Sequence, residues 1–183
     1  IDEEIIGSLV GGGAQAMIEK AYLHLGLKLP ISNLNVLIDD FLEFYKENCT
    51  KRSLIYPGVI ETIKILKSKY KICICTNKRQ SITERILKNL SIYCLFDIVL
   101  GSSLNFKLKP DSQMLNHIIK KLEIKPNEAV MIGDSSNDII PAKNLGLKTI
   151  FVNYGYGNQN DKLKAEHSVN RFDEIIKYLD SKF

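Results

Sequence analysis

The chain has 183 residues, an apolar fraction of 45% and a formal net charge of +4 at pH 7. This length allows one domain, or one domain with a small appendage, and no run of about 18 apolar residues predicts a transmembrane helix or a membrane partner. Lysines are spread along the chain without a dense basic block, so we expect no nucleic-acid partner.

The four cysteines, Cys49, Cys73, Cys75 and Cys94, lack a metal-ligand spacing. Reduced, buried thiols predict a cytoplasmic location. The acidic start, Ile1-Asp2-Glu3-Glu4, has neither an initiator Met nor a signal peptide. We therefore expect a piece of a longer chain or a processed one.

The first 55 residues show helical patterns only. Apolar residues recur with helical spacing over 13–26, where Gly26 closes the pattern, and again over 33–49. The run Gly11-Gly12-Gly13 precedes the first of these helices. It is expected to be a flexible turn or helix start, or a close approach of the backbone to a substrate.

Strands and helices alternate after Pro57-Gly58. The strand over 71–76 is apolar on both faces, which is typical of parallel sheets covered by helices on both sides. The alternation predicts right-handed crossovers and an α/β fold with a doubly wound parallel sheet. The expected elements are a helix near 59–66, strand 71–76, helix 82–90, strand 96–100, helix 114–122, strand 129–132, helix 137–145, strand 148–152, a short strand near 168–169 and a helix over 175–179.

Polar residues follow the first of these strands. Thr76, Asn77 and Lys78 stand at its end, directly before a predicted helix. A hydroxyl and the backbone N–H groups of a helix start can hold a phosphate oxygen. The alternative is a helix N-cap without a ligand, since Thr and Asn both cap well.

A lysine precedes the next predicted helix. Pro110 suits a helix start, with Asp111 or Ser112 among its first residues. Lys109 would then supply positive charge to a phosphate and to a carboxylate. The alternative is a surface lysine beside a proline.

Two carboxylates flank the turn after strand 129–132, in Gly133-Asp134-Ser135-Ser136-Asn137-Asp138. Open α/β sheets bind ligands at the carboxyl ends of their strands, and carboxylate oxygens suit Mg²⁺. The alternative is that Asp134 and Ser135 cap a helix while Asp138 favours its dipole.

The order Thr-Asn, Lys-Pro and Gly-Asp-x-x-x-Asp resembles the haloacid dehalogenase superfamily of phosphotransfer enzymes, over residues 57 to about 157. The resemblance is strongest to the phosphoglycolate phosphatase-like branch, through Pro57-Gly58-Val59, Phe96-Asp97, Lys109-Pro110-Asp111 and Asn153-Tyr154-Gly155-Tyr156. It implies a Rossmann-like core over 56–183 and a partial α-helical cap over 1–55.

The resemblance also implies roles for the site residues in a phosphatase that acts on a small phosphorylated metabolite, with glycolate phosphate as the first guess. Thr76 and the Asn77 amide would hold a phosphate oxygen, and Lys109 would balance negative charge. Asp134 would bind Mg²⁺, and Asp138 would support it as an outer ligand or through hydrogen bonds. The substrate-binding candidates are Lys78, Gly11, Gly12 and Gly13.

One family motif is missing. The family's Asp-x-Asp-x-Thr, which provides an aspartyl nucleophile and an acid/base, has no counterpart because no Asp-x-Asp occurs here. Asp39-Asp40 falls inside a helical pattern, and Asp97 within a predicted strand. We expect this motif upstream of Ile1 in the intact protein, where it would form an aspartyl-phosphate, and we expect these residues alone to lack turnover.

The apolar strand that carries this motif in the family is missing as well. In such folds that first strand lies between the strands that end at Thr76 and Ile132. Its absence should therefore leave two inner sheet edges unpaired.

Several alternatives stay open at this point. A non-catalytic binding protein could keep only Mg²⁺ or phosphate binding, which the missing motif supports. Other enzyme branches are a sugar phosphomutase, against which Gly133-Asp134 argues mildly, a dehalogenase, which needs no Mg²⁺, and a pyrophosphatase. The sequence gives no indication of the oligomeric state.

Overall fold

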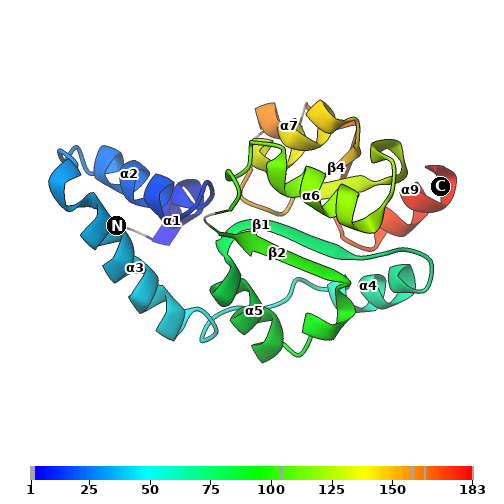
Figure 1. The fold of residues 1–183 in the computed structure, drawn as a ribbon, viewed down its shortest axis with the longest axis horizontal. Helices are drawn as coiled ribbons and strands as arrows, with labels where there is room; N and C mark the ends of the chain where they lie inside the picture. The colour runs from blue at the N-terminus through cyan, green and yellow to red at the C-terminus, as the bar shows by residue number, and fades with distance from the viewer. Residues whose placement is uncertain (1–2, 104, 158, 163, 183) are drawn as a thin grey trace.

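A computed structural model describes residues 3–103, 105–157, 159–162 and 164–182 (Figure 1). The acidic start at Ile1 and Asp2 lies outside the described residues. The helices are α1 (Glu3–Leu9), α2 (Ala14–His24), α3 (Leu34–Asn48), α4 (Val59–Lys67), α5 (Gln80–Asn89), α6 (Gln113–Leu122), α7 (Ser136–Leu145), α8 (Gln159–Lys162) and α9 (Glu174–Lys182). The strands are β1 (Cys73–Arg79), β2 (Ile98–Ser102), β3 (Val130–Gly133), β4 (Lys148–Val152) and β5 (His167–Val169).

All strand pairings are parallel, and the strands form two separate groups. β1 pairs with β2, and β3, β4 and β5 form a second sheet in that order. Helices α6 and α7 lie on one side of the strands and α4 and α5 on the other (Figure 1). The predicted α/β class with a doubly wound parallel arrangement is confirmed.

A cavity of about 770 Å³ separates the two groups of strands. Its walls are β1 and β3, together with helices from both faces, including Leu66 of α4 and Leu115 of α6. It runs from the start of β1 to Thr76, Asp134 and Asp138 at the carboxyl ends of the strands. The expectation of two unpaired inner edges is therefore confirmed for the described residues.

Apolar side chains hold each group of strands to its helices. On the α9 face, Ile150 and Ile175 are completely buried in a cluster that also includes Leu66 of α4. On the other face, Leu115 and Ile119 of α6 pack with Ala142 of α7. The apolar residues of α6 recur with helical spacing and so lie on one face of the helix. This apolar face is buried against the strands.

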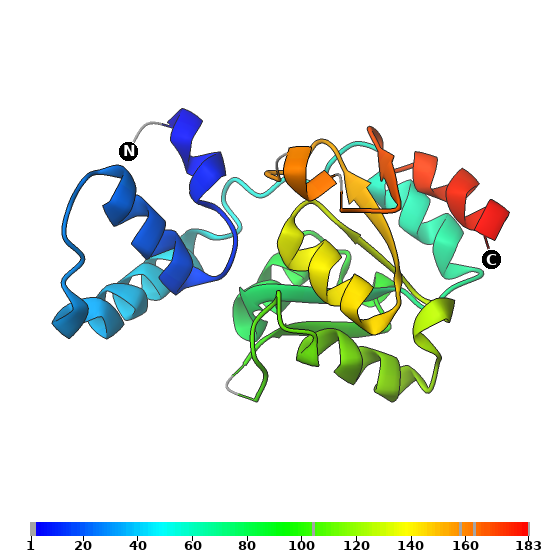
Figure 2. The same ribbon diagram turned by 90° about the horizontal axis from the view of Figure 1, so that it is seen from above.

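The helical segment α1–α3 lies beside the carboxyl ends of β1 and β2 (Figures 1 and 2). One contact with the rest of the chain lies at α3, where Leu42, together with Cys49 directly after the helix, forms a buried cluster with Ile82 of α5. The helices expected over 13–26 and 33–49 are confirmed as α2 and α3.

Three local predictions were wrong. Asp97 does not lie in a strand but directly precedes β2. Its carboxylate accepts the backbone N–H of Ile72 at 2.9 Å. Thr76, Asn77 and Lys78 do not follow the strand but lie inside it, because β1 continues to Arg79; since α5 begins only at Gln80, Thr76 and Asn77 do not cap that helix either.

The helix expected to start at Pro110 begins at Gln113. The residue before a proline disfavours helical backbone, so residues 108–111 form a turn in which the Asp111 N–H bonds the Leu108 carbonyl at 3.0 Å. The Asp111 carboxylate then accepts the Gln113 N–H at 2.9 Å. None of the described helices is long and apolar enough to cross a bilayer.

Candidate active site

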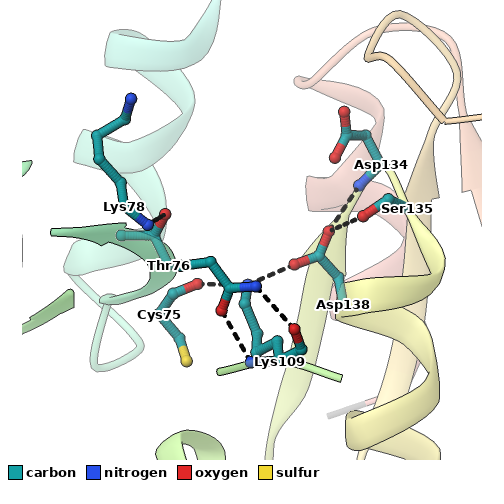
Figure 3. Close-up of polar contacts among 8 residues, drawn as sticks. Cys75, Thr76, Lys78, Lys109, Asp134, Ser135 and Asp138 are labelled. Carbon is teal, nitrogen blue, oxygen red and sulfur yellow. Dashed lines mark hydrogen bonds and ion pairs between the residues drawn. The ribbon is translucent and has the colours of Figure 1, made fainter. Parts of the chain in front are cut away.

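Lys109 connects β1 to the first turn of α7. Its Nζ donates to Oδ1 of Asp138 at 2.5 Å and to the carbonyl of Cys75 at 2.6 Å (Figure 3). Both side chains of the ion pair are buried, with 6% of Lys109 and 12% of Asp138 exposed. Lys109 is therefore not the surface lysine of the alternative interpretation.

Asn77 fixes the backbone of Lys109. Its amide Nδ2 donates to the Lys109 carbonyl at 2.7 Å, and its Oδ1 accepts the Lys109 N–H at 2.8 Å. The Asn77 side chain is thus fully engaged within the protein. The neighbouring Thr76 accepts the Lys78 N–H at its Oγ1 (3.2 Å), which leaves its hydroxyl proton available as a donor.

Asp138 organises the turn that carries Asp134. Its Oδ2 accepts the Asp134 N–H at 3.3 Å and the Ser135 hydroxyl at 3.2 Å (Figure 3). Gly133 permits this turn, because a Cβ atom there would lie 2.5 Å from Oδ2 of Asp138. Asp138 thus binds Lys109 through Oδ1 and the 133–135 turn through Oδ2.

Asp134 has a different environment. Its Oδ2 accepts the backbone N–H of Tyr156 at 2.7 Å. Among the described residues no cation lies within ion-pair distance of its carboxylate. Two tyrosines beside it stay protonated to high pH. Burial is the main cause that raises the pKa of Tyr154 to about 12, and the charges of Tyr56 and Asp134 add to it. Burial also raises the pKa of Tyr56, with smaller contributions from Tyr156 and Asp134.

The glycine run lies at the mouth of this site. A Cβ atom at Gly11 would lie 3.8 Å from Nδ2 of Asn137, and one at Gly13 would lie 3.9 Å from the Asn77 carbonyl. All three glycines have positive φ (109°, 80° and 95°), a backbone region that other residues rarely adopt.

The ammonium group of Lys78 is not brought together with the other candidates. Its Nζ donates to the hydroxyl of Tyr45 on α3 and lies 4.4 Å from the centre of that ring. The structure therefore gathers Thr76, Lys109, Asp134 and Asp138 in the lining of the cavity, and Asn77 joins them through its hydrogen bonds to Lys109. Lys78 also lines the cavity, but its ammonium is directed to Tyr45 of α3.

The oxygen ligands for a divalent cation are few in this region. Among the described residues no group of three or more His, Cys, Asp or Glu side chains could hold a metal. Asp134 offers a carboxylate without a cationic partner, which fits Mg²⁺, an ion that often takes one or two carboxylates with water and phosphate oxygens. Asp138 is committed to Lys109.

Sequence reasoning did not identify three contributors to this site. They are the Tyr156 N–H on Asp134, the Ser135 hydroxyl on Asp138 and the Cys75 carbonyl on Lys109. Two of them are backbone groups, whose hydrogen bonds cannot be predicted from residue type. The alternation of tyrosine and glycine over 154–157 was the available signal for the first.

Comparison with known proteins gives a consistent result. Residues 2–152 match the family model described as "Haloacid dehalogenase-like hydrolase". A phosphoglycolate phosphatase of Mesorhizobium japonicum is 32% identical over 177 residues, which cover 96% of this chain and 78% of that protein. A phosphoglycolate phosphatase of Caulobacter vibrioides is 29% identical over 171 residues, which cover 92% of this chain and 72% of that protein.

Solved structures agree with the fold. A predicted phosphoglycolate phosphatase from Haemophilus somnus superposes with a TM-score of 0.86 at 26% identity, over 98% of this chain and 83% of that one. A predicted phosphatase from Clostridium acetobutylicum gives a TM-score of 0.85 at 26% identity, over 98% and 82%.

Proposed function

The chain belongs to the haloacid dehalogenase-like hydrolase family and is a phosphatase of that kind, and from this premise we propose a Mg²⁺-dependent phosphomonoester hydrolase of the phosphoglycolate phosphatase-like branch. The substrate is a small phosphorylated metabolite, and 2-phosphoglycolate is the first compound to test, because curated relatives carry that name. A cytoplasmic location remains a prediction from the cysteines.

The proposal is carried by one observation, the convergence of Lys109, Asp138 and Asp134 at the end of the cavity beside Thr76. A buried ammonium and a hydroxyl donor suit the oxygens of a phosphoryl group, since such donors are strongest where water is excluded. Residues 56–183 form the core in this proposal. Residues 1–55 form a partial cap, whose glycine run borders the site.

Each residue has a proposed role. The Thr76 hydroxyl and the Asn77 backbone N–H donate to a non-bridging phosphate oxygen. Lys109 neutralises charge on the phosphoryl group, and Asp138 holds the Lys109 ammonium in position. Asp134 is the metal ligand of this chain, and bound Mg²⁺ would orient the phosphoryl group and screen its charge. Lys78 stays a substrate-binding candidate only if it leaves Tyr45.

The nucleophile is proposed to come from outside the 183 residues. An apolar strand that ends in Asp-x-Asp would fit the cavity between β1 and β3 and bring two further carboxylates beside Asp134. In the intact protein the first of these would form an aspartyl-phosphate, and the second would protonate the leaving group and then activate water. A non-catalytic binding protein is the alternative that the absent motif favours.

The coding sequence upstream of Ile1 gives the first test. An apolar strand that ends in Asp-x-Asp-Gly-Thr supports the enzyme, and its absence supports the binding protein. The protein that includes this strand should hydrolyse 2-phosphoglycolate with Mg²⁺, and Asp134→Asn should lower kcat by roughly a hundredfold or more. Asp173→Asn, which alters an exposed partner of Arg171, is the matched control. Equal activity of the two variants would remove Asp134 from the site.

A further inference from the structure

The loop that follows β4 wraps around Asp134. This loop, residues 153–157, has the sequence Asn-Tyr-Gly-Tyr-Gly and approaches the turn that carries Asp134 after β3. β3 and β4 are parallel neighbours, with Gly133 opposite Phe151, so their carboxyl ends lie side by side. The loop therefore meets Asp134 because of the strand register.

The loop touches Asp134 with its backbone. The Tyr156 N–H donates to Oδ2 of Asp134 at 2.7 Å. At Gly155, a Cβ atom would overlap the Asp134 side chain and lie 2.6 Å from its Cγ. At Gly157, a Cβ atom would lie 2.7 Å from the Asp134 carbonyl carbon. Neither glycine has positive φ, so it is the close approach to Asp134 that requires a residue without a side chain.

Neighbouring contacts hold this loop in place. Tyr154 packs against the buried cluster of Ile150 and Ile175, and its ring lies 4.8 Å from that of Tyr56. The Asn153 N–H donates to the Val169 carbonyl at 2.9 Å, and its side-chain amide donates to Asn170 at 2.8 Å. The backbone that meets Asp134 is thus anchored on β5 and on the core.

The other oxygen of Asp134 is left for a ligand. No described residue donates a hydrogen bond to Oδ1 of Asp134, whereas Oδ2 has the Tyr156 N–H. A carboxylate held through one oxygen by a rigid backbone presents the other in a defined direction. Loss of a group that orients a metal ligand in this way typically weakens metal binding or activity by about 10- to 100-fold.

We infer that the 153–157 loop is the positioning element of Asp134: Gly155 admits the carboxylate and the Tyr156 N–H fixes its orientation. Gly155 and Tyr156 are positioning residues, because they act through Asp134. The inference deepens the proposed function, since its consequence for Mg²⁺ rests on Asp134 being a metal ligand. The geometric part holds without any metal.

The first experiment measures geometry in residues 1–183 without metal. Carbon-13 labelling of aspartate reports the Asp134 carboxyl, assigned by its loss in Asp134→Ala. Gly155→Ala should shift this resonance and speed exchange of the Tyr156 amide proton by about tenfold or more, because the added methyl displaces the acceptor. The Asp97 and Asp173 resonances should not move. Asn153→Ala, whose side chain faces Asn170, is the control within the same loop.

A folded Gly155→Ala variant with an unchanged Asp134 resonance overturns the inference. If that variant does not fold, Asp134→Ala decides, because removal of the acceptor should expose the Tyr156 amide to exchange. An unchanged exchange rate there also overturns the inference.

The second experiment measures Mg²⁺ affinity by calorimetry on the same chains. Gly155→Ala should weaken binding by about tenfold or more, and should cause no further loss in an Asp134→Ala background. Additive losses would contradict positioning through Asp134. If the unaltered chain binds no Mg²⁺, the proposed metal role fails on its own, and the metal-free experiment still decides the inference.

Discussion

Lys109 is the residue on which the geometry of the site depends. Its ammonium joins Cys75 of β1 to Asp138 of α7, and its backbone pairs with the side chain of Asn77. A buried ion pair gains little net stability over an apolar pair, but removal of one partner leaves an uncompensated charge. Removal of Lys109 is therefore expected to destabilise the fold because the Asp138 carboxylate would stay buried without its cation.

We predict that Lys109→Met lowers the free energy of unfolding by about 3 to 5 kcal/mol, because Asp138 stays buried without its cation. Urea denaturation measures this. The matched control is Lys107→Met, at an exposed position two residues earlier. Replacement of both partners, with Asp138→Leu added to Lys109→Met, should recover part of the loss, because the double variant has no unpaired buried charge but lacks the acceptor for the Asp134 N–H and the Ser135 hydroxyl. Equal stability of the Lys109 and Lys107 variants would show that the pair is not buried in solution.

Cys75 lies between the cavity and the ion pair. Burial raises the pKa of its thiol to about 11, and Asp138 adds to the effect while Lys109 opposes it. The native state therefore holds the thiol proton more tightly than the unfolded state does. Stability from this group is complete below the unfolded pKa near 9 and is lost as pH rises through about 11.

We predict that the chain loses about 2 to 3 kcal/mol of stability between pH 9 and pH 11 through Cys75 alone. Other groups titrate in this range, so the measured quantity is the difference between the unaltered chain and Cys75→Ala. The difference in unfolding free energy should narrow by that amount as the pH rises. A constant difference would show that Cys75 titrates equally in both states.

At the scale of elements, α3 and α5 join the helical segment to the core. Leu42 of α3 and Cys49, directly after that helix, pack in a buried cluster with Ile82 of α5, which is 3% exposed. α5 starts immediately after β1, so this contact sets α3 beside the end of the strand that carries Thr76. Tyr45 of α3 adds a hydrogen bond from Lys78.

We predict that Ile82→Ala costs about 2 to 5 kcal/mol and releases α3, since a cavity would replace the shared contact. Hydrogen exchange should show a loss of protection over Leu34–Asn48 that exceeds the loss in α6. Ile65→Ala, at a position 51% exposed, should change stability by no more than about 0.5 kcal/mol. Uniform loss of protection in both helices would contradict a local role for the α3–α5 contact.

At the scale of the whole molecule, the strands form two parallel groups around a cavity. Both inner edges, β1 and β3, end beside the candidate site. On one face α6 carries the chain over the gap between β2 and β3, and on the other Leu66 of α4 packs with Ile150 of β4. The site is thus divided between two halves that the helices hold together.

We predict that residues 1–183 alone show no turnover of a chromogenic phosphomonoester with Mg²⁺, because the chain carries no Asp-x-Asp motif. A steady-state assay with and without chelator measures this. Asp134→Ala is the control for contaminating phosphatase, whose activity it would leave unchanged. Turnover that disappears in Asp134→Ala would show that the 183 residues hold their own nucleophile.

The sequence predicted the order of the strands and of the longer helices, but not the short helices α1 and α8. Apolar spacing gave strand 148–152 at its observed bounds and the parallel α/β class, because periodicity reports which face of an element is buried. The sequence placed Asp134, Asp138, Lys109 and Thr76 after successive strands, and this predicted that they lie close together, although Thr76 falls inside β1. Parallel strands place such ends at one edge whatever their separation along the chain.

Tertiary structure alone decided how each of these groups is used. The commitment of Asp138 to Lys109, the direction of Lys78 toward Tyr45 and the hold of the Tyr156 N–H on Asp134 all join residues distant in sequence. The position of Asp97 was mispredicted for the same reason, since its partner Ile72, directly before β1, is 25 residues away in the sequence. Residue type and spacing report local preference and burial, but a hydrogen-bond partner is fixed only when packing brings two segments together.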